Sequence, residues 1–145
     1  MDVRRSTQEL VAVNRKDAKS WRVLVVDDEK DNLRVISKLL VFLGAEVHTA
    51  RSGLEGLDML KKIKPTFILS DLSMPMMNGW RMFKEVRNDP ETQQIPIIAI
   101  TAHAKWGTKE SLLAEGFDGY IAKPFGISTF LTEIQRCLAC TGVGV

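Results

Sequence analysis

Short apolar runs alternate along this chain with stretches in which apolar residues recur every three or four positions. The clearest runs are Val23–Val26, Phe67–Leu69 and Ile97–Ile100. Continuous aliphatic and β-branched runs of this length are typical of strands that are covered on both faces. Two weaker runs complete the pattern. We therefore predict five strands, at 23–26, 46–50, 67–69, 96–100 and 117–122, the third running straight into Asp71.

The stretches between these runs have helical periodicity. Leu33, Ile36, Leu40 and Leu43 share one helical face, and the sequence Ser52-Gly53-Leu54-Glu55 is a capping box that opens a second helix. That second helix carries Leu54, Leu57 and Leu60, and three more follow: one presenting Trp80, Phe83 and Val86, one over 105–115, and one presenting Ile127, Phe130, Leu131, Ile134 and Leu138. Strict alternation of strands and helices predicts an α/β fold with a doubly wound, five-stranded parallel sheet and five helices.

The length of 145 residues fits one domain. We predict an N-terminal arm or linker at 1–20, flexible or partly helical, a domain at 21–140 and a short tail at 141–145. The first residues are mostly polar and charged, and no apolar run approaches the roughly 20 residues of a membrane-spanning helix. We therefore expect a cytoplasmic protein with no membrane partner.

The small net charge of +2 lies in the arm. Residues 1–20 hold five basic and three acidic side chains, which leaves 15 of each in the rest of the chain. A nucleic-acid-binding domain concentrates basic residues on one face. A neutral domain therefore argues against a nucleic-acid partner.

Polar residues stand at the carboxyl ends of four predicted strands, where doubly wound sheets bind their ligands. They are Asp27, Asp28, Asp71, Thr101 and Lys123. Neighbouring carboxylates repel one another, and a hard divalent cation such as Mg²⁺, or Mn²⁺ as an alternative, relieves the repulsion. An ionised aspartate beside such a cation can attack phosphorus, and an ammonium and a hydroxyl group can hold the transferred phosphoryl oxygens.

Four short motifs resemble those of response-regulator receiver domains. They are Val25-Val26-Asp27-Asp28-Glu29, then Asp71-Leu72-Ser73-Met74-Pro75-Met76-Met77-Asn78-Gly79, Thr101-Ala102 and Lys123-Pro124-Phe125. Each motif alone is weak, but their order and their positions at strand ends make the resemblance strong over residues 21–140. The resemblance implies a flavodoxin-like strand order of 2-1-3-4-5.

The resemblance also implies a role for each site residue. Asp71 would accept a phosphoryl group. Asp27, Asp28, Asp71 and the backbone carbonyl of Ser73 would hold Mg²⁺. Lys123 would bind a phosphoryl oxygen, through a chain whose Lys123–Pro124 bond is cis. Thr101 and Tyr120 would form the conformational switch.

The same resemblance implies a phosphodonor and a signalling surface. The donor would be a histidine kinase or a histidine phosphotransfer domain. The surface formed by the fourth helix, fifth strand and fifth helix would contact an unidentified downstream protein or a second copy in a homodimer. Such a protein is a phosphoacceptor that assists its own phosphorylation and dephosphorylation, and we expect no other enzymatic activity.

Three alternatives stay open at this point. The chain could be a receiver module from a hybrid histidine kinase. It could be a pseudo-receiver that only binds partners, although such proteins normally lack the equivalents of Asp71 or Lys123. It could be a phosphatase of the haloacid dehalogenase type, but that class has a D-x-D motif after its first strand, and here Asp27 and Asp28 are adjacent.

Overall fold

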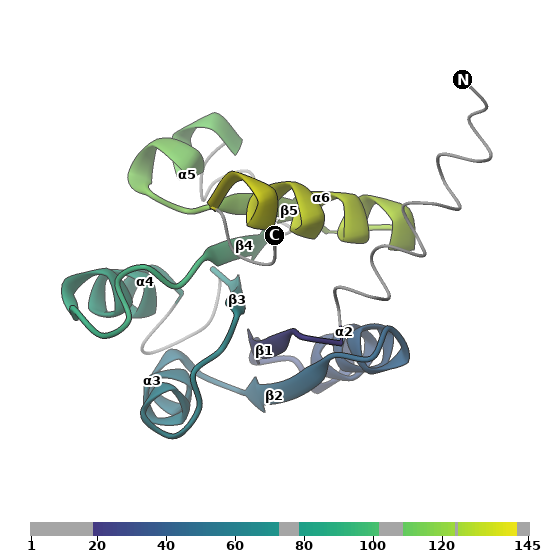
Figure 1. Cartoon of the computed structure of the whole chain (residues 1–145), viewed down its shortest axis with the longest axis horizontal. Coiled ribbons are helices and arrows are strands. Elements are labelled where there is room, and N and C mark those ends of the chain that lie inside the picture. The colour runs from purple at the N-terminus through teal and green to yellow at the C-terminus, as the bar shows by residue number, and fades with distance from the viewer. Residues whose placement is uncertain (1–18, 73–78, 102–108, 124, 142–145) are drawn as a thin grey trace.

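The computed structural model describes residues 19–72, 79–101, 109–123 and 125–141 and contains a parallel sheet with the order β2-β1-β3-β4-β5 (Figure 1). The five strands are β1 (Arg22–Val26), β2 (Glu46–Ala50), β3 (Phe67–Asp71), β4 (Ile97–Thr101) and β5 (Gly119–Ala122). The helices of the described residues are α2 (Lys30–Phe42), α3 (Gly53–Lys62), α4 (Gly79–Asn88), α5 (Lys109–Glu115) and α6 (Ile127–Thr141). The predicted fold class and strand order are confirmed.

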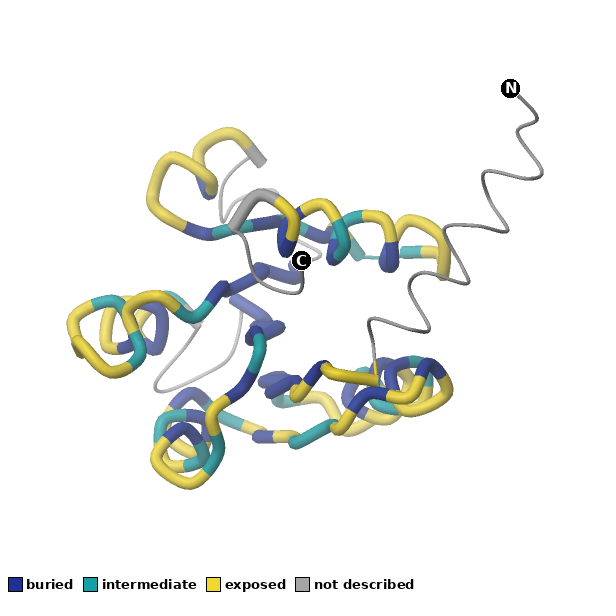
Figure 2. Tube along the Cα trace, viewed as in Figure 1, coloured by how far each residue is buried: buried dark blue, intermediate teal, exposed yellow. Residues whose placement is uncertain are grey.

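Alternation of side chains along the strands divides the apolar interior into two clusters, one on each face of the sheet. Val23, Val25 and Ile98 point to the face covered by α2 and α6. Leu24 and Ile68 point to the face covered by α3, α4 and α5. The three central strands, β1, β3 and β4, are buried, whereas the outer helix surfaces are exposed (Figure 2). Burial on both faces explains the continuous apolar runs in the sequence.

The helix ends follow their local sequence. Gly44 ends α2 with a φ of 100°, a left-handed conformation that glycine adopts without strain. Ser52 caps α3, because its Oγ accepts a hydrogen bond of 3.1 Å from the Glu55 N–H. The Glu55 carboxylate accepts from the Arg51 N–H at 3.0 Å. The serine half of the predicted capping box therefore forms, whereas the Glu55 carboxylate binds the N–H of Arg51 instead of the N–H of Ser52.

Several details differ from the sequence-based prediction: β1 begins one residue earlier, β4 is shifted by one residue to Ile97–Thr101, and two larger differences have a physical reason. The fifth strand begins at Gly119, two residues later than expected. The Asp118 N–H still donates to the Ile97 carbonyl at 2.8 Å, but the Ile97 N–H is bound by the Asp118 carboxylate at 2.8 Å, which also accepts from Arg87 at 2.6 Å. The second difference concerns Leu54, which fits the helical apolar pattern of α3 but is 58% exposed.

Arg87 makes a polar cluster at the end of α4. Its guanidinium donates to the carbonyl oxygens of Ile95 at 2.7 Å, Gln93 at 3.1 Å and Gly116 at 3.2 Å, and it pairs with Asp118. It also lies over the ring of Phe83, 5.2 Å from the ring centroid. One side chain thus joins α4, the start of β4 and the segment before β5.

Candidate functional site

Three carboxylates meet at the carboxyl edge of the sheet. Asp27 and Asp28 directly follow β1, and Asp71 is the last residue of the adjacent strand β3. Each offers a carboxylate oxygen, and these oxygens lie within 4.8 Å of one another. Asp27 and Asp71 are buried, whereas Asp28 is half-buried. The structure therefore brings together the three acidic residues that the sequence placed at strand ends.

Lys123 reaches this cluster from the carboxyl end of β5, the edge strand two positions beyond β3. Its Nζ donates to Asp27 Oδ2 at 3.1 Å and to Asp71 Oδ2 at 3.5 Å. The backbone holds it there, since the Lys123 N–H donates to the Thr101 carbonyl at 3.0 Å just beyond the β4–β5 ladder. Its side chain is only 16% exposed. The ammonium is thus fixed between two buried carboxylates.

The burial of this cluster shifts two pKa values. Desolvation raises the pKa of Asp27, helped by the neighbouring charge of Asp71 and opposed by the Glu29 backbone N–H and by Lys123. Burial alone would lower the pKa of Lys123, but the charges of Asp27 and Asp71 and hydrogen bonds with both raise it. Lys123 therefore stays charged, and its single positive charge leaves the carboxylates incompletely neutralised.

A backbone donor at this site could not be predicted from the sequence. The Glu29 N–H donates to Asp27 Oδ1 at 3.0 Å, and the Asp27 N–H donates to the Ala50 carbonyl at 3.1 Å. Every residue carries such a donor, so no residue type marks it. These bonds hold the Asp27 carboxylate in position beside Asp71.

The predicted switch residues lie on one face of the sheet. Thr101 ends β4 and is buried, and Tyr120 in β5 is half-buried against the cluster that includes Leu112 and Phe117. Ala99 is the partner of Tyr120 in the β4–β5 register, so Thr101 stands two residues further along the same side of β4. Tyr120 therefore lies on the same face of the sheet as Thr101, beside the cluster that contains Leu112 of α5.

Two predicted features lie outside the described residues. They are the Ser73 carbonyl, expected as a metal ligand, and the Lys123–Pro124 bond, expected to be cis. Among the described residues, no helix is both long enough and apolar enough to cross a membrane.

The donor set fits a hard divalent cation. Asp27, Asp28 and Asp71 provide oxygen ligands only, which Mg²⁺ and Mn²⁺ prefer, and their three negative charges face one ammonium group. Burial has already raised the pKa of Asp27, so a bound cation would stabilise its ionised form. The residues present are therefore suited to such an ion.

A doubly wound parallel sheet with an acidic cluster and a lysine at its carboxyl edge defines a class of small α/β proteins that bind charged groups at that edge. The family model of the response regulator receiver domain matches residues 23–135. This chain belongs to the response-regulator receiver family, which excludes the haloacid dehalogenase alternative.

Relatives and solved structures agree with this assignment. The polar-differentiation response regulator DivK of Brucella ovis is 34% identical over 116 residues, which are 80% of this chain and 94% of that protein. The chemotaxis response regulator CheY4 of Vibrio cholerae is 34% identical, with a TM-score of 0.73, over 81% of this chain and 98% of that one. The receiver domain of a Pseudomonas aeruginosa sensor histidine kinase, with a magnesium ion coordinated in its active-site cleft, is 29% identical, with a TM-score of 0.71, over 84% and 98% of the two chains.

Proposed function

We propose that this protein is a phosphorylation switch that accepts a phosphoryl group on Asp71 from a histidine kinase or a histidine phosphotransfer domain. The observation that carries this proposal is the convergence of Asp27, Asp28, Asp71 and Lys123 from three strand ends. The acidic cluster suits Mg²⁺, and the similar receiver from Pseudomonas aeruginosa has a magnesium ion in its active-site cleft.

The chemistry assigns one task to each side chain. A carboxylate oxygen of Asp71 attacks the phosphorus of a phosphohistidine; the new P–O bond forms as the P–N bond breaks, and the imidazole nitrogen leaves with the electron pair and takes up a proton. No separate base is needed, because a carboxylate is itself the nucleophile. A cation held by Asp27, Asp28 and Asp71 would offset the negative charge of the phosphoryl oxygens. Lys123, already within 3.5 Å of Asp71, binds one of those oxygens.

Phosphorylation then acts on the surface formed by α5, β5 and α6. The Thr101 hydroxyl turns towards the phosphoryl group, and Tyr120 follows into the space released. α5 is a seven-residue helix whose one buried leucine is Leu112, while Leu113 is 41% exposed. A helix with so little buried apolar surface can shift at low cost. The changed surface would bind a downstream protein or a second copy of the chain.

Intact-protein mass spectrometry after incubation with Mg²⁺ and acetyl phosphate tests the proposal. The expected result is one added phosphate, which is absent when EDTA is present from the start and absent in Asp71→Asn. Asp31→Asn, an exposed carboxylate in the first turn of α2, is the matched control and should be labelled like the wild type. Labelling of Asp71→Asn at the wild-type rate would refute Asp71 as the acceptor.

Some receivers accept phosphate only from their kinase, so beryllofluoride binding follows if no mass is added. Failure of both measurements would favour the pseudo-receiver alternative. Whether this domain belongs to a response regulator or to a hybrid histidine kinase is a separate question, because proteins of both kinds resemble the chain. One is a response regulator that aligns over 94% of its length, and the other is the receiver domain of a sensor histidine kinase. We favour a response regulator over a hybrid-kinase module because of the first of these two matches.

A further inference from the structure

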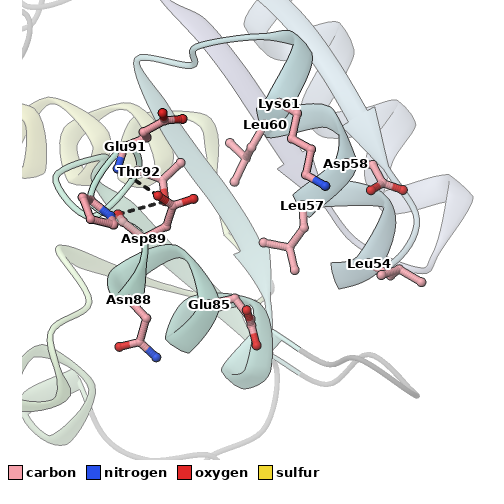
Figure 3. A pocket seen from close by; sticks show the side chains of 11 residues that line it. Leu54, Leu57, Asp58, Leu60, Lys61, Glu85, Asn88, Asp89, Glu91 and Thr92 are labelled. Atoms are coloured by element: carbon pink, nitrogen blue, oxygen red, sulfur yellow. Dashed lines mark hydrogen bonds between the residues drawn. The ribbon is translucent and has the colours of Figure 1, made fainter.

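A groove with an apolar floor and an acidic rim lies between α3 and α4, away from the phosphorylation site (Figure 3). It encloses about 540 Å³. Leu57 and Leu60 point into it from α3, and the exposed Leu54 stands at one end. The lining residues also include Asp58, Glu85, Asp89 and Glu91 against one cation, Lys61. The groove therefore suits a segment that carries both apolar and basic side chains.

A second hollow continues this groove along the amino-terminal edge of the sheet. The two hollows share Pro90 and Glu91, and the second is also lined by Pro65 and Thr66. Thr66 lies against the start of β1, because its Oγ1 accepts from the Arg22 N–H at 2.9 Å. The two hollows therefore adjoin at Pro90 and Glu91, and the second reaches Thr66, which lies beside the start of β1.

The segment that precedes β1 has the matching chemistry. It contains two basic pairs, Arg4-Arg5 and Arg15-Lys16, and between them the apolar run Leu10-Val11-Ala12-Val13. Four basic and three acidic residues give residues 1–18 a net charge of +1, whereas the groove lining has four carboxylates and one lysine. The basic pair nearest to β1 would meet Asp89 and Glu91 first, and the apolar run would follow onto the leucines.

The distance to be covered is short. The groove begins at the loop before β4, two strand positions from β1 in the sheet, which is about 10 Å. The nine residues from Leu10 to Ala18 span up to roughly 30 Å when extended. The chain can therefore pass beneath the edge of the sheet from Lys19 to the groove with residues to spare.

We propose that residues 1–18 dock in the groove between α3 and α4 of the same chain. The exposed face of α2, with Val35 and Val41, is closer to Lys19, whose side chain contacts Gly44 at the end of that helix. However, the exposed surface of α2 also carries Arg34 and Lys38, which would repel the basic pairs of the segment. Charge complementarity thus selects the groove.

A spin label on the segment tests this proposal in the full chain. Thr7→Cys carries the nitroxide in a Cys140→Ser background, since Cys137 is buried. We expect amide relaxation rates in an isotope-labelled chain to rise several-fold at Leu57, Lys61 and Asn88. The effect should disappear in a groove variant, and persist in a control variant with the same change of charge elsewhere. The groove variant is Asp58→Asn, Glu85→Gln, Glu91→Gln, and the control is Asp31→Asn, Glu110→Gln, Glu115→Gln.

Three outcomes would overturn the proposal. One is broadening centred on Val35 and Val41, which would place the segment on α2. Another is broadening of similar size over the whole chain, or broadening that stays the same in the groove variant. The third comes from a mixture of spin-labelled chains without isotope and isotope-labelled chains without the nitroxide. Broadening in that mixture would show that the groove binds the N-terminal segment of a second copy.

Discussion

Replacing Lys123 with methionine removes the ammonium group that lies between Asp27 and Asp71 while keeping a side chain of similar volume. The Nζ atom is 3.1 Å from one carboxylate and 3.5 Å from the other, and the lysine side chain is 16% exposed. Removing one partner of a buried ion pair leaves an uncompensated charge and typically costs 3–5 kcal/mol. Because Lys123 retains some contact with water, we expect a loss of about 3 kcal/mol in the free energy of unfolding without divalent ions.

Saturating Mg²⁺ should recover most of that loss. An ion bound to the three carboxylates provides the positive charge that Lys123 no longer supplies, so the deficit should fall to about 1 kcal/mol. By linkage, the variant then gains about 2 kcal/mol more than the wild type from Mg²⁺, which corresponds to roughly thirtyfold tighter binding. The variant should nevertheless fail to transmit phosphorylation to the α5–β5–α6 surface.

Urea unfolding monitored by circular dichroism, in EDTA and then in Mg²⁺, measures the free energy of unfolding of the wild type and of Lys123→Met under both conditions. Lys62→Met, which removes an exposed lysine at the end of α3, is the control and should change stability by less than about 0.5 kcal/mol. An equal loss with and without Mg²⁺ would refute the reasoning. A collapse of Mg²⁺ affinity in Lys123→Met would show instead that Lys123 positions the carboxylates for the ion.

Three further predictions concern stability. Arg87→Met should lower the free energy of unfolding by about 2 kcal/mol, and a double-mutant cycle with Asp118→Asn should show strong coupling. Gly119→Ala should cost about 2 kcal/mol in thermal unfolding, because its Cβ would lie 1.9 Å from Cys137 Sγ, and Cys137→Ala in the same chain should restore part of that loss. Asp27→Asn should stabilise the metal-free protein at neutral pH. In the folded protein the pKa of Asp27 is raised above its ordinary value of 3.8, so ionisation of Asp27 lowers the free energy of unfolding as the pH rises from 3.8 through the folded-state pKa. The advantage of Asp27→Asn should therefore shrink in unfolding curves below that interval.

The sequence was sufficient to predict the fold and the members of the acidic cluster. Periodicity separates strands from helices, and alternation of the two leaves few topologies. The carboxyl ends of parallel strands lie at one edge, and the strand order implied by the receiver resemblance places β1 beside β3, so Asp27 and Asp71 were expected to be neighbours. Lys123 and Thr101 follow from the same rule, although their roles in phosphoryl transfer stay predictions.

Side-chain contacts between distant segments could not be predicted. Arg87 and Asp118 are 31 residues apart, and neither breaks the periodic pattern in a way that points to the other. Their pairing depends on how the end of α4 packs beside β4, which is a property of the assembled fold. The exposure of Leu54 has a similar origin: it lies in the first turn of α3 and fits the apolar stripe of that helix, but which turns of a helix a neighbouring element covers depends on the assembled fold.

The division of the interior by the sheet has an evolutionary consequence. Residues such as Val25 and Ile98 contact only the α2 and α6 side, while Leu24 and Ile68 contact only the opposite side. Substitutions in separate clusters should affect stability almost additively. Each face of the domain can therefore diverge in sequence without compensating changes on the other, so that the surfaces above α2 and above α5 can acquire different partners while the carboxylates between them stay the same.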